Sequence, residues 1–265
     1  MATSGQEPGR VNEDFAGAVA HAVVLLDGAG IRGAEAICRH GVAWYTHRLG
    51  GALLHRLSVD DGRDLAELLA EAIGELTDAH RDTCDVTDPS SPSATVAMLR
   101  FDAEQVEYLL LGDSVILLDR IGREPLVVTD RREVEFRQPL LDALGAHEPG
   151  SAAYERVRAE GVSVMRANRN HPGGFWVAKD EPGAAAEAVT GSLPVTGLTA
   201  AALLSNGASR IADRYALADW PEVLSLLGTH GPAEVVDRVR EAERRPGGAA
   251  PDDATVAYCV LPRLP

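Results

Sequence analysis

Short apolar runs that end at acidic or glycine-containing corners recur along the chain. The first run, Val-Val-Leu-Leu at 23–26, stops at Asp27-Gly28. A run of this length bounded by turn residues predicts a buried β-strand, which we place at 23–30. The polar corner Asn12-Glu13-Asp14 precedes it, and a hairpin between the two would bring Asp14 near Asp27. Residues 1–8 carry no periodic pattern, and we expect a loose lead-in there.

Later apolar runs predict further strands. Three closely spaced runs favour an antiparallel meander with Asp113 at a hairpin tip: 94–101, 106–111 and 115–118. The run at 199–205 stops at Asn206-Gly207. Its short length and the glycine favour a strand, although periodicity alone also allows a helix. A short strand at 175–178 and a last strand at 254–261 complete the set.

Other segments place apolar residues three and four positions apart, which is the spacing of an amphipathic helix. The predicted helices are 35–57 with a kink at Gly50-Gly51, 64–82, 182–189, 209–216, 220–227 and 233–244. From 131 to 171 the pattern is also helical but more charged. We interpret 131–190 as a helical insertion or flap over one end of the sheets, and 244–248 as a linker. A length of 265 residues suits a single domain over 1–265.

Charge and cysteine content narrow the classes of function. The formal net charge of −15 and a pI near 4.9 argue against nucleic-acid binding, because phosphate backbones require clustered Lys and Arg. The polar N-terminus and the lack of any apolar run of about 18 residues predict a cytoplasmic protein without a membrane partner. Cys38, Cys84 and Cys259 are widely spaced, so we predict reduced core thiols and neither a zinc site nor a disulfide framework. The histidines of the first two predicted helices, His40, His47, His55 and His80, are interpreted as surface or capping residues.

The acid-bearing corners are the candidate chemistry. The end of a strand fixes the backbone of an acid, and a neighbouring glycine lets another group approach the main chain, which suits a metal or phosphate site. Each corner alone is also compatible with an ordinary turn, and Asp27-Gly28 with a hairpin turn in particular. Their order along the chain carries more information: Asn12-Glu13-Asp14, Asp27-Gly28-Ala29-Gly30, Ser93-Ala94-Thr95, Gly112-Asp113-Ser114, Ser205-Asn206-Gly207 and Asp252-Asp253-Ala254-Thr255.

In this order and spacing the chain resembles the metal-dependent protein phosphatases, the type 2C serine/threonine family, and its bacterial members. The resemblance spans 12–260, and 131–193 is its least similar section. It implies an α+β fold of four layers, αββα, in which two antiparallel sheets lie between helices. It also implies two Mn²⁺ or Mg²⁺ ions, with a third possible, and a water that bridges two ions and attacks the phosphorus of phosphoserine or phosphothreonine. A phosphorylated protein would be the partner, in a signalling role.

The resemblance also assigns roles to residues of this chain. The metal ligands would be Asp27, which bridges both ions, the carbonyl of Gly28, the position of Asn206, Asp252, and Asp113 for a weaker third ion. Asp14, together with Glu13, would hold metal-bound waters, and Arg10 is the candidate for binding phosphate. Asp253 stands where the family usually has Asn and is expected to be a neighbour of the site.

One departure from the family affects the predicted activity. The usual Ser-Asp-Gly is Ser205-Asn206-Gly207 here, so a neutral amide replaces a carboxylate ligand. An Asn oxygen can still bind a hard cation, but the lost charge should lower metal affinity by about 1 kcal/mol or more. The alternative to an active phosphatase is therefore a pseudophosphatase that acts as a binding or regulatory module. A third interpretation, an amide hydrolase with an N-terminal nucleophile, would rest on Thr3 or Ser4.

Overall fold

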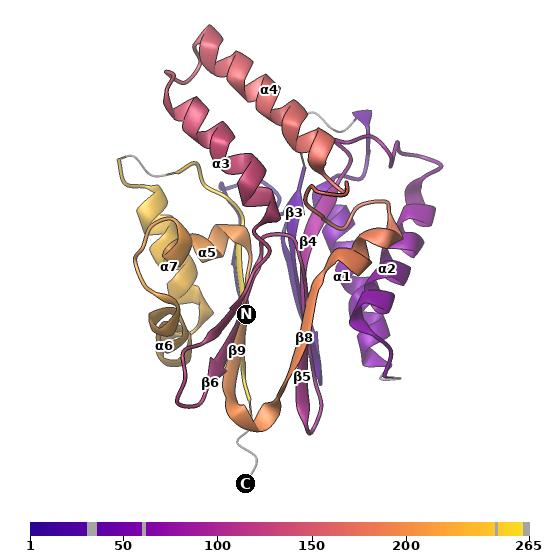
Figure 1. Ribbon diagram of the computed structural model, residues 1–265, viewed down its shortest axis with the longest axis vertical. Coiled ribbons are helices and arrows are strands. Elements are labelled where there is room, and N and C mark those ends of the chain that lie inside the picture. Colours follow the sequence, from indigo (N-terminus) through magenta and orange to yellow (C-terminus); the bar gives the residue numbers. More distant parts are fainter. Residues whose placement is uncertain (31–35, 60–61, 247–248, 262–265) are drawn as a thin grey trace.

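The computed structural model describes residues 1–265 apart from 31–35, 60–61, 247–248 and 262–265. Two five-stranded antiparallel sheets pack face to face and helices cover both outer faces (Figure 1). The predicted α+β sandwich of four layers is confirmed. No helix in the described part of the chain has both the length and the apolar character that a membrane crossing requires.

The two sheets take strands from both halves of the chain. The first sheet contains, in spatial order, β1 (Ala2–Ser4), β10 (Ala254–Val260), β9 (Leu198–Leu204), β6 (Val115–Arg120) and β7 (Leu126–Val128). The second contains β2 (Phe15–Val19), β3 (Ala22–Ala29), β4 (Ser93–Phe101), β5 (Gln105–Leu111) and β8 (Val189–Pro194).

Helices form the outer layers and one projection. The second sheet is covered by α1 (Val42–Ser58) and α2 (Leu65–His80), and the first by α5 (Asn206–Asp213), α6 (Trp220–His230) and α7 (Pro232–Glu243). A hairpin of α3 (Arg132–Gly145) and α4 (Ala152–Asn168) extends beyond one end of the sheets (Figure 1). Two short 3₁₀ turns, η2 (Pro182–Glu187) and η3 (Val195–Gly197), lie on either side of β8.

Strand β3 shows why its sequence is a continuous apolar run. Val24 and Leu26 pack under α1 and α2, whereas Val23 and Leu25 face the other sheet. Successive side chains of a strand point to opposite faces, so a strand that is covered on both faces has no polar positions until it ends. Burial therefore stops at Asp27, where the strand reaches the edge of the sandwich.

Two of the predicted strand arrangements are wrong. Residues 1–8 are not wholly a loose lead-in, because β1 pairs with β10 in the register Ala2↔Val256. The three middle strands do not form a meander, since β5 belongs to the second sheet and β6 to the first. Asp113 therefore lies on a crossover between the sheets. Strands of both sheets are apolar on both faces, so periodicity cannot assign a strand to one sheet or the other.

Smaller differences concern the ends of elements. Helix α1 starts at Val42, and the predicted start near Gly33 and Glu35 lies outside the described residues, as does part of the linker at 247–248. The helix continues through Gly50, where an added Cβ would lie 2.3 Å from the Phe15 ring, so this glycine allows close packing. Residues 175–178 form only isolated bridges. The short strands β7 and β8 have no counterpart in the prediction.

Candidate functional site

The predicted acidic corners meet at one edge of the sandwich. Asp27 lies near the end of β3 of the second sheet, while Asn206 begins α5 just after β9 of the first. The backbone N–H of Asn206 donates to Oδ2 of Asp27 at 2.8 Å. The side-chain amide of Asn206 donates to Oδ2 of Asp113 at 2.8 Å. Asn206 therefore links two carboxylates that are 86 residues apart in the sequence. Because its Nδ2 donates to Asp113, its amide oxygen is free to act as an acceptor.

A second layer of charge lies around Asp113. Nη2 of Arg137 on α3 donates to Oδ2 of Asp113 at 3.0 Å, and Glu133 lies one turn earlier, 3.9 Å from Nη1 of Arg137. Burial, and then the charge of Asp113, raises the pKa of Glu133 to about 7. Burial also raises the pKa of Asp113, although Arg137 and Asn206 act against the increase. Glu133 and Arg137 were not predicted as site residues. Only their spacing of four positions could have indicated them, and they lie in 131–193, the section that least resembles the family.

Asp14 is the most enclosed of the predicted acids. Its residue is 4% exposed, and neither carboxyl oxygen has a hydrogen-bond partner among the described residues. Burial raises its pKa to about 7, the charges of Asp253 and Asp252 add to the increase, and the hydroxyls of Thr255 and Ser205 oppose it. A buried carboxyl group without a partner is costly unless a proton or a cation compensates its charge.

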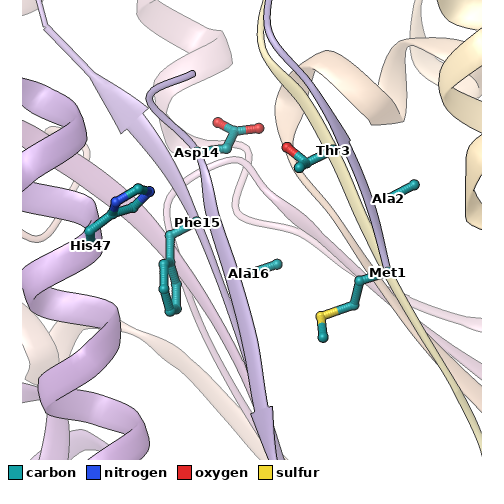
Figure 2. Close-up of a pocket in the computed structure, with 7 residues that line it drawn as sticks. All are labelled: Met1, Ala2, Thr3, Asp14, Phe15, Ala16 and His47. Carbon is teal, nitrogen blue, oxygen red and sulfur yellow. The ribbon is translucent and has the colours of Figure 1, made fainter. Parts of the chain in front are cut away.

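A cavity of about 360 Å³ reaches Asp14 from the side of the two edge strands. Figure 2 shows Asp14 at one end, with Thr3 opposite and the rings of Phe15 and His47 along one wall. Its other lining residues are Met1, Ala2 and Ala16. Thr3 lies in β1, where its Oγ1 is 2.7 Å from Oγ1 of Thr255. Thr3 is thus an internal strand residue, which gives no support to the N-terminal nucleophile interpretation.

Asp27 lies within the field of several other acids. Its pKa is raised well above its usual value, first by burial and then by the charges of Asp14, Asp252 and Asp113. The hydrogen bond from the Asn206 backbone lowers it only in part. Three neighbouring carboxyl groups thus disfavour the ionisation of Asp27, and such an accumulation of acids is typical of cation sites.

The pair Asp252-Asp253 divides into two roles. Oδ2 of Asp252 accepts a hydrogen bond from Nη2 of Arg210 on α5 at 2.6 Å. Asp253 is 4% exposed, and its two oxygens accept the backbone N–H groups of Gln6 and Glu13, both at 2.7 Å. Both oxygens of Asp253 are therefore used to hold the N-terminal segment, in keeping with the expectation that it neighbours the site.

The structure also shows the surroundings of two further predicted residues, Gly28 and Arg10. A Cβ on Gly28 would lie 2.4 Å from the carbonyl oxygen of Glu13, so only glycine fits this close crossing of two chains. Arg10 donates from Nη1 to Oε1 of Gln6 at 3.0 Å. Its charge acts on Glu13, whose pKa is raised by burial and lowered in part by Arg10.

The donor set at this edge fits a hard divalent cation. It offers carboxylate oxygens, one amide oxygen and backbone carbonyls, with no sulfur or imidazole ligand among the predicted site residues. The unpartnered oxygens of Asp14 and the mutual repulsion at Asp27 are both features that a cation would relieve. The fold and the site together define the class of protein: a layered β-sandwich that carries an acidic, oxygen-lined cation site at one edge.

Comparison with known proteins identifies the family. The family model for protein phosphatase 2C matches residues 3–163, which is more than half of the chain, and the chain therefore belongs to the protein phosphatase 2C family. This is a family of protein serine/threonine phosphatases. A search of curated proteins finds no match.

Solved structures share the fold at low sequence identity. The serine/threonine phosphatase PstP/Ppp of Mycobacterium tuberculosis is 21% identical with a TM-score of 0.61, over 98% of this chain and 96% of that one. The catalytic domain of PstP in complex with two manganese ions is 19% identical with a TM-score of 0.60, over 98% of this chain and 96% of that one. The serine/threonine phosphatase Stp1 from Staphylococcus aureus is 13% identical with a TM-score of 0.58, over 98% of this chain and 93% of that one. At these identities the similarity establishes the fold and leaves the roles of single residues open.

Proposed function

We propose that this protein hydrolyses phosphoserine or phosphothreonine on protein substrates, with Mn²⁺ or Mg²⁺ held at the acidic edge. The observation that carries the proposal is the convergence of Asp14 and Asp27 at the second sheet with Asp113 on the crossover between the sheets, with the oxygens of Asp14 buried and unpartnered. Membership in the protein phosphatase 2C family and a fold shared with a manganese-bound phosphatase domain support it. We expect a cytoplasmic protein whose macromolecular partner is its phosphorylated substrate.

The residues that would hold the cations are Asp27, the carbonyl of Gly28, Asn206, Asp252 and, for a third ion, Asp113. When bound, divalent cations lower the pKa of water and neutralise the charge of a phosphoryl group. Asp14, whose pKa is already close to neutral, can accept a proton from water at this edge or return one. Burial of Asp14 keeps bulk water away from its carboxyl group, which strengthens the charge interactions that it makes.

Two arginines are candidates for holding the phosphate oxygens. Arg10, the residue expected from the sequence, is tied to Gln6. Arg137 contacts Asp113 and its charge also interacts with Asp27, while its side chain is 33% exposed and can reach a ligand. A guanidinium group offers two parallel donors to a phosphate.

We expect Arg137→Ala to raise KM for an aryl phosphate more than Arg10→Ala does, with similar folding of both variants by circular dichroism.

The alternative is a pseudophosphatase that keeps the fold and binds without turnover. Asn206 favours this alternative, because it lacks the negative charge of the family's usual ligand. Its side-chain NH₂ group also donates a hydrogen bond to Asp113. Binding of a phosphopeptide would then take place with little or no hydrolysis.

Hydrolysis of an aryl phosphate with Mn²⁺ separates the two functions. For a phosphatase we expect measurable turnover in the unmodified protein and loss of at least about 100-fold in Asp27→Ala, because the bridging carboxylate is removed. Asn206→Asp should tighten Mn²⁺ binding by about tenfold through its added charge. Asn168→Asp on the outer helix α4 is the matched control and should change neither quantity.

The opposite pattern would support the binding module. Turnover that is absent in the unmodified protein and appears only in Asn206→Asp would identify a site that lacks one ligand. Turnover that persists in Asp27→Ala would place the chemistry elsewhere and refute the proposal. Thermal unfolding of each variant with and without Mn²⁺ distinguishes a lost site from a lost fold.

A further inference from the structure

A cluster of sulfur and nitrogen ligands lies away from the acidic edge. Cys38 and His40 precede α1, and Cys84 follows α2, so the cluster joins two segments that the sequence separates by 44 residues or more. One ligand atom from each residue lies within 4.8 Å of the other two. Nδ1 of His40 is 3.3 Å from Sγ of Cys84 and 3.9 Å from Sγ of Cys38. Among the described residues it is the one group of three such side chains with this spacing.

These distances match the edges of a tetrahedral zinc site. Zn–S and Zn–N bonds of about 2.3 and 2.0 Å at tetrahedral angles give S···N separations of about 3.6 Å and S···S separations of about 3.8 Å. Hydrogen bonds can link His40 with the two thiols pair by pair, whereas one bound ion would hold all three ligand atoms at once.

Backbone N–H groups act on both sulfurs, and at Cys84 they help to favour the thiolate. The backbone N–H groups of His40 and Gly41 act on Cys38 and lower its pKa, although burial, the larger effect, leaves it raised. For Cys84 burial raises the pKa, but the Cys38 thiol, Thr83 and the backbone N–H groups of Arg39 and His40 together lower it below its usual value. Metal-binding thiolates require such donors, since the negative charge must be stabilised.

The surroundings fix the imidazole. The His40 ring stacks on Trp44 with centroids 4.2 Å apart, and His80 lies edge-on at 6.1 Å. His80 is buried and its Nδ1 bonds to the carbonyl of Leu76 at 2.6 Å, so it forms part of the wall. His80 is therefore not the surface residue that was predicted, whereas Cys38 and Cys84 are buried free thiols, as predicted. The spacing of the three ligands along the chain has no zinc-motif pattern, and only folding brings Cys84 to the other two.

We propose that Cys38, His40 and Cys84 bind one Zn²⁺ ion, with water in the fourth position. Soft thiolates and an imidazole select zinc, whereas the oxygen donors of Asp27 and its neighbours select Mn²⁺ or Mg²⁺. The ion would fasten the segment that enters α1 to the segment that follows α2. This inference does not depend on the proposed phosphatase activity, because it uses none of those residues.

Cobalt absorption tests the site directly on the full chain. The protein is purified under reducing conditions, stripped with a chelator and titrated with Co²⁺ and then Zn²⁺. We expect one equivalent of Co²⁺ to produce thiolate-to-cobalt charge-transfer absorption, and one equivalent of Zn²⁺ to abolish it. Cys38→Ser, Cys84→Ser and His40→Gln should each weaken Zn²⁺ binding at least about 100-fold. Cys259→Ser, which removes the distant third thiol, and Asp27→Ala should leave the signal unchanged.

The contrary results are equally specific. Absence of charge-transfer absorption in the folded unmodified protein refutes the site, as does absorption that survives in the Cys38→Ser and Cys84→Ser double variant. A Cys38–Cys84 disulfide in protein kept under reducing conditions also refutes it. The spectrum of the unmodified protein decides the question even if a variant fails to fold.

Discussion

Asp253 shows how one side chain can organise a distant part of the chain. Its oxygens accept the N–H groups of Gln6 and Glu13, which lie at least 240 positions earlier. These bonds hold the corner that carries Asp14 against the start of β10. Hydrogen bonds to an ionised carboxylate are among the stronger ones, and here they are shielded from water.

We expect Asp253→Ala to lower the free energy of unfolding by about 3 kcal/mol, because two backbone donors lose their acceptor. Asp253→Asn should cost less, since its amide oxygen can still accept one of them. Urea denaturation of the metal-free proteins measures both, and Asp252→Ala is the neighbouring control with a smaller expected loss. Equal losses for Asp252→Ala and Asp253→Ala would contradict the role of Asp253.

The sequence predicted some of these residues much better than others. The corners at Asp27 and Asn206 follow directly from where apolar runs stop, Asp14 follows from the corner that precedes the first run, and the structure brings the three together. Glu133 and Arg137 could not be found this way, because a surface helix with charges at i and i+4 occurs in many proteins. The Cys84 contact to His40 depends on how α2 packs, which no local pattern reports.

At the scale of elements, the α3–α4 hairpin differs from the rest of the molecule. No residue of α3 is fully buried, although Glu133 is largely covered, and in α4 only Gly161 is buried. Gly161 accommodates Leu140 of α3, whose Cδ1 would lie 2.1 Å from an added Cβ. The hairpin touches the acidic edge through Arg137 and Asp113. With few buried contacts, it has little to resist local opening.

We therefore expect amide hydrogen exchange in α3 and α4 to be faster than in α1 and α2 by at least about tenfold, because the latter pack a buried stripe against the second sheet. Exchange followed by mass spectrometry measures this at peptide resolution. Arg137→Ala should accelerate exchange in α3 further and leave α2 unchanged. Protection of the hairpin equal to that of the sheets would contradict this description.

Element length explains which parts of the fold the sequence predicted. The long amphipathic helices α1, α2 and α7 and the apolar strands β3 and β4 have clear periodicity. Strands β1 and β7 have three residues each, too few for a pattern, and their existence depends on a partner strand. Sheet membership of β6 depends likewise on the crossover at Gly112, where a positive φ of 89° redirects the chain.

At the scale of the whole molecule, the accumulated acids make stability depend on pH and metal together. In the metal-free protein burial raises the pKa of Asp14 from 3.8 to about 7. Between these values the folded chain keeps a proton that the unfolded chain has released. The stability that this group contributes is thus fully present at low pH and is lost as pH rises toward about 7.

We expect the metal-free protein to lose a few kcal/mol of stability, on the order of 1.4 per unit of pKa shift, as pH rises from about 4 to about 7. Asp14→Asn should flatten this dependence, and the exposed Asp142→Asn should not. Mn²⁺ should reverse the trend, because it binds ionised carboxylates and releases their protons. Chemical denaturation across pH, with chelator or Mn²⁺, provides the measurement. Stability that rises with pH in chelator would contradict the assignment.

The pairing of β1 with β10 has a consequence for biosynthesis. During translation the first strand must wait for its partner, since residue 256 is made long after residue 2. Asp252 and Asp253 arrive at the same late moment, so an incomplete nascent chain cannot close its acidic edge. If the proposed function is correct, a ribosome stalled before residue 252 would hold a polypeptide without phosphatase activity.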